Sequence, residues 1–117
     1  MLYDKLKSKK SFNNIRNHGS SYVAPAFVIL VNKTNNADEK LKVGFTTSKK
    51  VGNAVVRARS RRRLKAAFAE IPQETIDTFK GFEFNIIARH KSLAVDFEKL
   101  VFYFQKTLQN INKDYVK

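Results

Sequence analysis

The chain has 117 residues, the size of one domain, and 43% of them are hydrophobic, which is enough to bury a modest core. It contains no cysteine, which excludes disulfide bonds and thiolate metal sites. Its 23 lysines and arginines against 10 acidic residues give a formal net charge of +13. The expected partner is therefore a polyanion, nucleic acid before an anionic membrane surface.

The first half of the chain predicts one helix and two strands. Residues 11–18 read as a helix with Ser11 as its N-cap and Gly19 at its end. A continuous apolar run after Pro25 predicts a strand buried on both faces, and residues 41–48 alternate as a second strand. The polar stretch between these strands reads as a turn.

The second half predicts a helix, a strand and a long closing helix. Asn53 is placed to cap a helix over residues 54–70, which a proline ends. Residues 82–89 predict a third strand, and residues 92–112 predict a helix whose apolar positions recur every three or four residues. We therefore expect a single α+β domain over residues 1–117, with one mixed sheet covered by helices.

The sequence also argues against a membrane protein. The N-terminal residues lack the apolar centre of a secretory signal. The longest mostly apolar run, residues 22–31, is far too short to span a bilayer. The expected location is the cytoplasm, without a membrane partner.

Residues 49–68 hold five arginines and three lysines without one acidic residue. In helical geometry the apolar positions of this segment fall in one sector, which must face the core. Ser60 falls inside that sector as a small polar residue. The basic positions lie opposite the sector or at its borders, where long side chains can reach solvent: Arg57, Arg61, Arg62, Arg63 and Lys65.

A run of charges usually marks a helix face that is exposed to solvent. On such a face, however, basic residues normally have acidic residues four positions away. Here that spacing brings like charges together, as in Arg57 and Arg61, at a total cost of roughly 1 kcal/mol in the isolated helix. A phosphate backbone would remove the repulsion, and guanidinium groups bind phosphate in a bidentate way. The segment therefore predicts contact with nucleic acid, and Lys49 and Lys50 precede a helix start that can bind an anion.

Residues 46–68 resemble the signature of the protein subunit of bacterial ribonuclease P, in the form TTSKKVGNAVVRARSRRRLKAAF. Four further segments follow in the order and at the spacing typical of that family: LKSKKSFNNIRNHG, FVILV, LKVGFTTSKK and EFNIIAR. The resemblance therefore covers nearly the whole chain. It implies a ribonuclease P protein-like fold with a left-handed βαβ crossover, an exception to the usual hand. It also implies a protein that binds a catalytic RNA and the 5′ leader of precursor tRNA and promotes removal of that leader.

The resemblance implies two RNA-binding surfaces, a basic helix that faces the RNA subunit and a leader cleft between the sheet and the first helix. Phe12 and Phe27 match cleft aromatics that would stack on unpaired bases, although core packing explains Phe27 equally well. The resemblance leads us to expect a second aromatic residue at Arg16 and a tyrosine at Leu30. Without these two rings, the cleft is predicted to stack less on bases and to depend more on phosphate contact. The positions assigned to the RNA subunit are Lys49, Lys50, Asn53, Arg57, Arg59, Arg61, Arg62 and Arg63, with Lys65 beside them.

Two positions of the motif depart from the family. Ala58 stands at the central asparagine of an Arg-Asn-Arg core, and Ser60 replaces an aliphatic residue. The alanine removes hydrogen bonds that an asparagine side chain would make. The sequence therefore leaves the local geometry of these two positions open.

No catalytic residue, cofactor or metal site is expected in the protein itself. His18 and His90 read as surface residues, and Asp96 and Glu98 point to different sides of a helix, which makes a poor metal pair. As a subunit of the ribonuclease P endoribonuclease, the protein is expected to leave the chemistry and its Mg²⁺ to the RNA subunit. Precursor tRNA is the other expected partner, and no protein partner is required. The alternative is a structural RNA-binding protein of ribosomal or nucleoid type, which the composition fits equally well.

Overall fold

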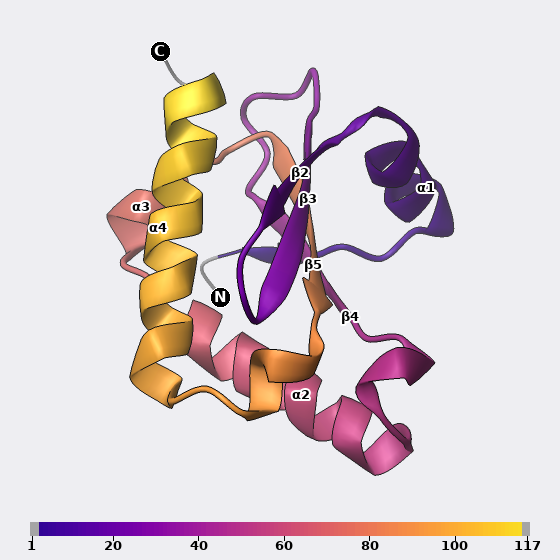
Figure 1. Cartoon of the computed structure of the whole chain (residues 1–117). Coiled ribbons are helices and arrows are strands. Elements are labelled where there is room, and N and C mark those ends of the chain that lie inside the picture. The colour runs from indigo at the N-terminus through magenta and orange to yellow at the C-terminus, as the bar shows by residue number, and fades with distance from the viewer. Residues whose placement is uncertain (1–2, 116–117) are drawn as a thin grey trace.

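The computed structural model describes residues 3–115, whose helices and strands form three layers. A five-stranded sheet lies in the middle, helix α1 covers one face, and α4 covers the other, with α2 packed at one end of that side (Figure 1). The strands are β1 (Asp4–Lys5), β2 (Ser20–Val23), β3 (Phe27–Lys33), β4 (Lys42–Thr46) and β5 (Phe82–Ala88). The helices are α1 (Lys9–His18), α2 (Ala54–Phe68), α3 (Gln73–Asp77) and α4 (Phe97–Tyr115), with 3₁₀ turns η1 (Lys49–Val51) and η2 (His90–Leu93).

The sheet is mixed. Its strand order is β1-β4-β5-β3-β2, in which β1, β4 and β5 run parallel and β3 is antiparallel to both of its neighbours. The chain passes from β4 through α2 and α3 to the adjacent parallel strand β5, which makes this connection a βαβ crossover. The predicted α+β domain with one mixed sheet is confirmed. The left hand of the crossover stays an expectation drawn from the family.

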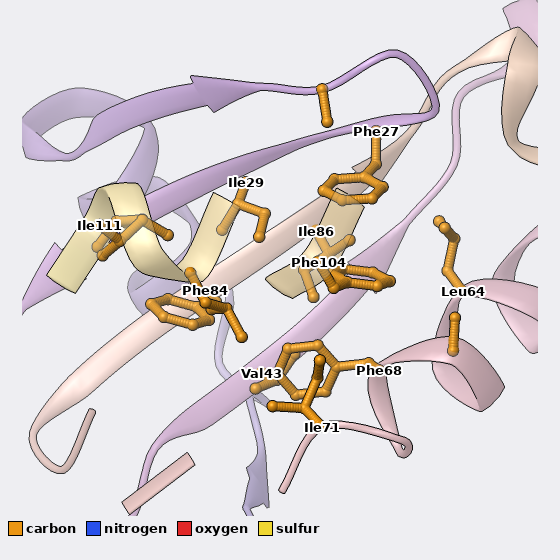
Figure 2. Close-up of a cluster of buried hydrophobic side chains, with 14 of the residues drawn as sticks. Phe27, Ile29, Val43, Leu64, Phe68, Ile71, Phe84, Ile86, Phe104 and Ile111 are labelled. Atoms are coloured by element: carbon orange, nitrogen blue, oxygen red, sulfur yellow. The ribbon is translucent and has the colours of Figure 1, made fainter. Parts of the chain in front are cut away.

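Side-chain alternation gives the sheet two unlike faces. Phe27 and Ile29 of β3 are buried on the side of α4, together with Phe84 and Ile86 of β5 (Figure 2). Val31 of β3 belongs to the same buried cluster. Val28 and Leu30, which alternate with them, are only half-buried on the side of α1. The prediction that this strand is buried on both faces is therefore wrong, because one short helix covers the second face only in part.

Three phenylalanines tie α2 and α4 to the sheet. Phe27 and Phe104 stack with ring centroids 4.2 Å apart and an interplanar angle of 13°. Phe68 of α2 meets Phe104 edge-on at 5.3 Å, so one ring of α4 joins the sheet to the second helix. The predicted apolar stripe of α4 is otherwise buried or half-buried, but Phe97 at its first residue is 38% exposed.

Helices α1 and α4 begin at other residues than the sequence predicts. α1 begins at Lys9, and its N-cap is Ser8, whose Oγ accepts a hydrogen bond from the Ser11 N–H at 3.0 Å. The cap therefore lies one turn earlier than the sequence predicts. α4 begins at Phe97 instead of residue 92, because His90–Leu93 form the separate turn η2.

The start of α2 is as predicted. Asn53 is its N-cap, and Asn53 Oδ1 accepts a hydrogen bond from the Val56 N–H at 3.0 Å. Gly52 before it has a φ of +151°, and a Cβ at that position would lie 2.7 Å from Val56 Cγ1. A glycine is thus required for the chain to turn into the helix, which ends at Phe68, two residues earlier than predicted.

Three short elements were not predicted: β1, β2 and α3. None of them is longer than 5 residues, too short for hydrophobic periodicity to be seen in a sequence. β2 is held by its antiparallel pairing with β3, and β1 by two residues paired with β4. The two short strands exist because a longer strand offers its edge, a tertiary cause that the local sequence does not contain.

The buried hydroxyls of Ser60 and Ser92 hydrogen-bond to each other and join α2 to η2. We expect Ser60→Ala to lower the free energy of unfolding by about 1–3 kcal/mol, because it leaves the Ser92 hydroxyl buried without a partner. Chemical denaturation of the RNA-free protein measures this. The double variant with Ser92→Ala should lose less than the sum of the two single losses. Additive losses would mean that the two hydroxyls do not stabilise each other.

Candidate nucleic-acid interface

Helix α2 presents its basic side chains on the face turned away from the core. Ser60, Leu64 and Phe68 are buried, whereas Arg59 and Arg62 are exposed. Among residues 3–115, neither exposed arginine forms an ion pair or a side-chain hydrogen bond. Two guanidinium groups are thus free to bind an anion from outside.

The other arginines of α2 are partly used by the fold. The Arg61 Nη1 donates to Thr47 Oγ1 at 2.7 Å, and the Arg63 Nη1 donates to the Ser92 carbonyl oxygen at 2.6 Å. Arg57 is half-buried, and its Nε lies out of solvent. The structure therefore divides the predicted RNA-binding arginines into two outward groups, Arg59 and Arg62, and three at the border of the core. Of these three, Arg61 and Arg63 are hydrogen-bonded to the fold, whereas Arg57 is only half-buried.

The segment before α2 and the end of its basic face add further positive charge. Lys49 and Lys50 of η1 are exposed, and so is Lys65, whose Nζ lies 5.9 Å from the centre of the Phe45 ring. Asn53 is also exposed, but its side-chain oxygen is occupied as the helix cap. The cap uses one of the two lone pairs of that oxygen, and the amide nitrogen remains able to donate a hydrogen bond.

The predicted cleft residues do not all lie together. Phe12 is half-buried on α1, and a Cβ added to Gly44 would lie 2.6 Å from its Cζ, so the tip of the ring rests on the β4 backbone. Arg16 is exposed and donates to Asn13 Oδ1 at 2.8 Å. Phe27 has no exposed surface and stacks on α4, on the opposite side of the sheet from α1. Its assignment to the leader cleft is wrong, because the alternation of β3 turns it into the core.

Sequence reasoning missed a second basic group after β5, the cations Arg89 and Lys91 with His90 between them. Together with Lys50 and Pro25 these residues line a depression of about 420 Å³ beside η1. The Arg89 Nη1 donates to the Ala24 carbonyl oxygen at 2.8 Å and so ties this group to the turn between β2 and β3. Three adjacent basic residues directly after a strand were the signal in the sequence.

The described residues contain neither a metal-ligating cluster nor a membrane-spanning helix. Within residues 3–115, no three histidine or acidic side chains come close enough together to hold a metal ion. Over the same residues, none of the helices has both the length and the apolar character needed to cross a bilayer.

These features define a small basic α+β domain that carries a cationic helix beside a mixed sheet. The family model described as Ribonuclease P matches residues 3–112. The chain therefore belongs to the family of ribonuclease P protein components, the protein part of a tRNA-processing endoribonuclease.

Related proteins support the same assignment. The ribonuclease P protein component of Nitratiruptor sp. is 32% identical over 108 residues, which cover 92% of each chain. That of Bacillus velezensis is 34% identical over 108 residues, 92% of this chain and 85% of the relative. The solved ribonuclease P protein of Thermotoga maritima has a TM-score of 0.75 at 23% identity, and the match covers 92% of this chain and 96% of that one. The fold is thus that of the ribonuclease P proteins.

Proposed function

We propose that this chain binds the catalytic RNA of ribonuclease P through the outward face of α2 and the 5′ leader of precursor tRNA beside α1. The single observation that carries the proposal is the pair Arg59 and Arg62, exposed and without a partner in residues 3–115, within the family's motif. Exposed guanidinium groups without a protein partner match the phosphates of a folded RNA, both in charge and in bidentate hydrogen-bond geometry.

The basic groups at the start of α2 extend the proposed RNA contact. Lys49 and Lys50 are exposed beside the helix N-terminus, where backbone N–H groups and the helix dipole also favour an anion. Lys65 continues the positive surface one turn beyond the two outward arginines. The residues we assign to this face are Lys49, Lys50, Arg59, Arg62 and Lys65, with Arg61 and Arg57 at its border.

The leader site that we propose lies on the half-buried face of the sheet next to α1. Phe12 is a half-buried aromatic side chain that could stack on a base, and the exposed Arg16 lies one helical turn further along α1. Val28 and Leu30 give this face an apolar floor. The leader would therefore be held by one stacking ring, apolar contact and phosphate contact, with little sequence preference.

The proposed role is to position RNA, and the reaction itself belongs to the RNA subunit. Ribonuclease chemistry needs an acid, a base and stabilisation of the developing charge. His18 lies at the end of α1 and His90 lies in η2. Within residues 3–115, neither histidine belongs to a cluster of three or more histidine or acidic side chains. Mg²⁺ would accordingly act through the RNA. Because both RNA partners would be met in the cytoplasm, we propose that location.

Reconstitution tests the function directly. The protein alone should not cleave precursor tRNA, whereas adding it to a bacterial ribonuclease P RNA should allow 5′ maturation at a lower magnesium concentration than the RNA needs alone. Gel analysis of the cleaved leader across a magnesium titration measures both results.

The control variants are His18→Ala and His90→Ala, which remove the two histidines that could act as an acid or a base. Cleavage by RNA-free protein that both variants retain would come from a contaminant. Cleavage that either variant abolishes would contradict the proposal that the RNA subunit carries out the reaction. A protein that leaves the magnesium requirement of the RNA unchanged would contradict the function itself and favour a structural RNA-binding role.

A further inference from the structure

Helix α4 carries an exposed aromatic ring on the side turned away from the sheet. Phe102 is 52% exposed, more than any other phenylalanine or tyrosine in residues 3–115. On the helical wheel it lies opposite the buried stripe that contains Leu100, Phe104 and Leu108. The helix itself stands at one side of the molecule (Figure 1). The Phe102 ring therefore adds little to the core and is available for a contact from outside.

A second ring helps to hold Phe102 in place. The centroids of the Phe102 and Tyr103 rings lie 6.2 Å apart, with an interplanar angle of 57°. Tyr103 is half-buried and packs against the core. The two side chains thus form a small ordered aromatic surface, and an ordered side chain loses little freedom when another surface packs against it.

Charged and polar side chains flank Phe102 in a regular pattern. Glu98 lies four residues before it and Lys106 four residues after it, and both are exposed. Within the part of the chain that the structure describes, neither of them forms an ion pair. Eight residues separate them, so they cannot pair with each other on one helix. At steps of three residues, the exposed Lys99 precedes Phe102 and the exposed Gln105 follows it.

This pattern is complementary to itself. If two copies of α4 cross antiparallel about a two-fold axis at Phe102, residues at equal steps before and after that position meet across the axis. Glu98 then lies opposite Lys106 of the second copy, the same contact forms twice, and the two Phe102 rings meet at the centre. A parallel arrangement would instead bring each of these charges against its own copy, which repels.

We propose that the outward side of α4 binds a second copy of this chain, in an antiparallel pair centred on Phe102. None of the cations assigned to RNA binding on η1 and α2 belongs to α4, so each paired chain would keep that face free. Such pairing needs no RNA and is therefore independent of the proposed function.

The net charge of the chain opposes this pairing at long range. Two copies that each carry +13 repel each other, whereas the Glu98 and Lys106 contacts act only at short range and select the orientation. At about 0.15 M salt, charges more than about 8 Å apart are largely screened from each other. We therefore expect a weak pair that is best observed at moderate salt.

Sedimentation equilibrium of the RNA-free, full-length chain tests the pairing. The average mass should rise towards that of a dimer as the concentration increases into the millimolar range. Phe102→Ala should weaken the association at least about tenfold, because it removes both central rings. Val55→Ala, which shortens a 69% exposed apolar side chain on α2, should not weaken it. A chain that stays monomeric throughout, or equal losses in the two variants, would overturn the inference.

Charge reversal separates this pairing from unspecific association. Glu98→Lys alone and Lys106→Glu alone should each abolish it, because like charges then meet across the axis. An equimolar mixture of these two variants should associate, since every lysine then faces a glutamate of the other chain. Lys113→Glu changes the net charge by as much as Lys106→Glu but should leave the pairing intact. If the mixture stays monomeric, or if Lys113→Glu and Lys106→Glu act alike, the chain does not pair through this side of α4.

Discussion

Replacing Arg59 and Arg62 together by alanine is expected to weaken binding of the ribonuclease P RNA by roughly tenfold per arginine, the effect of losing one charge-assisted contact each. Both guanidinium groups are exposed and unpaired within residues 3–115, so nothing in the fold depends on them. The log–log dependence of affinity on salt should flatten by about 0.7–0.9 for each lost phosphate contact. Filter binding at several salt concentrations measures both quantities.

The matched control for this experiment is Lys106→Ala with Lys113→Ala, which removes the same charge from an exposed side of α4. It should leave the affinity and the salt slope almost unchanged if the contact is local to α2. Equal losses in the two double variants would mean that the RNA responds only to net charge. The Arg59 and Arg62 variant should remain folded and become no less stable, because removing like charges spaced three and four residues apart relieves repulsion.

Arg63 should behave differently from the two outward arginines, although it is their neighbour in the same motif. It donates to the Ser92 carbonyl oxygen at 2.6 Å, so its removal would loosen α2 from η2. The sequence could not separate these roles, because Ser92 is 29 residues away and becomes a neighbour only in the fold. Position on the helical wheel predicts exposure, whereas the bonding partner is decided by tertiary structure.

The same distinction explains which parts of the fold could be predicted. The stripe of α4 and the cap at Asn53 depend on spacing and on local chemistry, which the sequence contains. The inward orientation of Phe27 could not be predicted, because β3 is a continuous apolar run in which neither face is marked by polar residues. Its partner Phe104 lies on a helix near the other end of the chain.

The departures from the family's motif have different outcomes. Ser60 occupies a buried position where the resemblance led us to expect an aliphatic residue, and its hydroxyl finds a partner in Ser92. A polar residue in the core is therefore satisfied by a second polar residue that lies 32 positions away in the sequence. Ala58 is half-buried, and nothing in the structure explains why an alanine stands there.

Phe12→Leu is expected to weaken binding of precursor tRNA with a long 5′ leader by about 1–3 kcal/mol in the complex with the RNA subunit, the value of one base–aromatic stack. Mature tRNA and the RNA subunit alone should bind nearly as before, because neither brings an unpaired leader to α1. Leucine keeps most of the apolar volume that rests on Gly44, so the fold should be little affected. Binding measured for leaders of increasing length separates the loss of stacking from a general loss of affinity.

Leader length is the decisive variable, because a short leader cannot reach the protein from the cleavage site. The loss caused by Phe12→Leu should be absent for the shortest leaders and should rise to a plateau once the leader spans the distance to α1. Phe102→Leu, the same change at an exposed position of α4, should give a flat response at every length. If Phe12→Leu lowers affinity equally for long-leader and leaderless tRNA, or if it lowers the melting temperature strongly, then Phe12 acts as a core residue and the leader is held elsewhere.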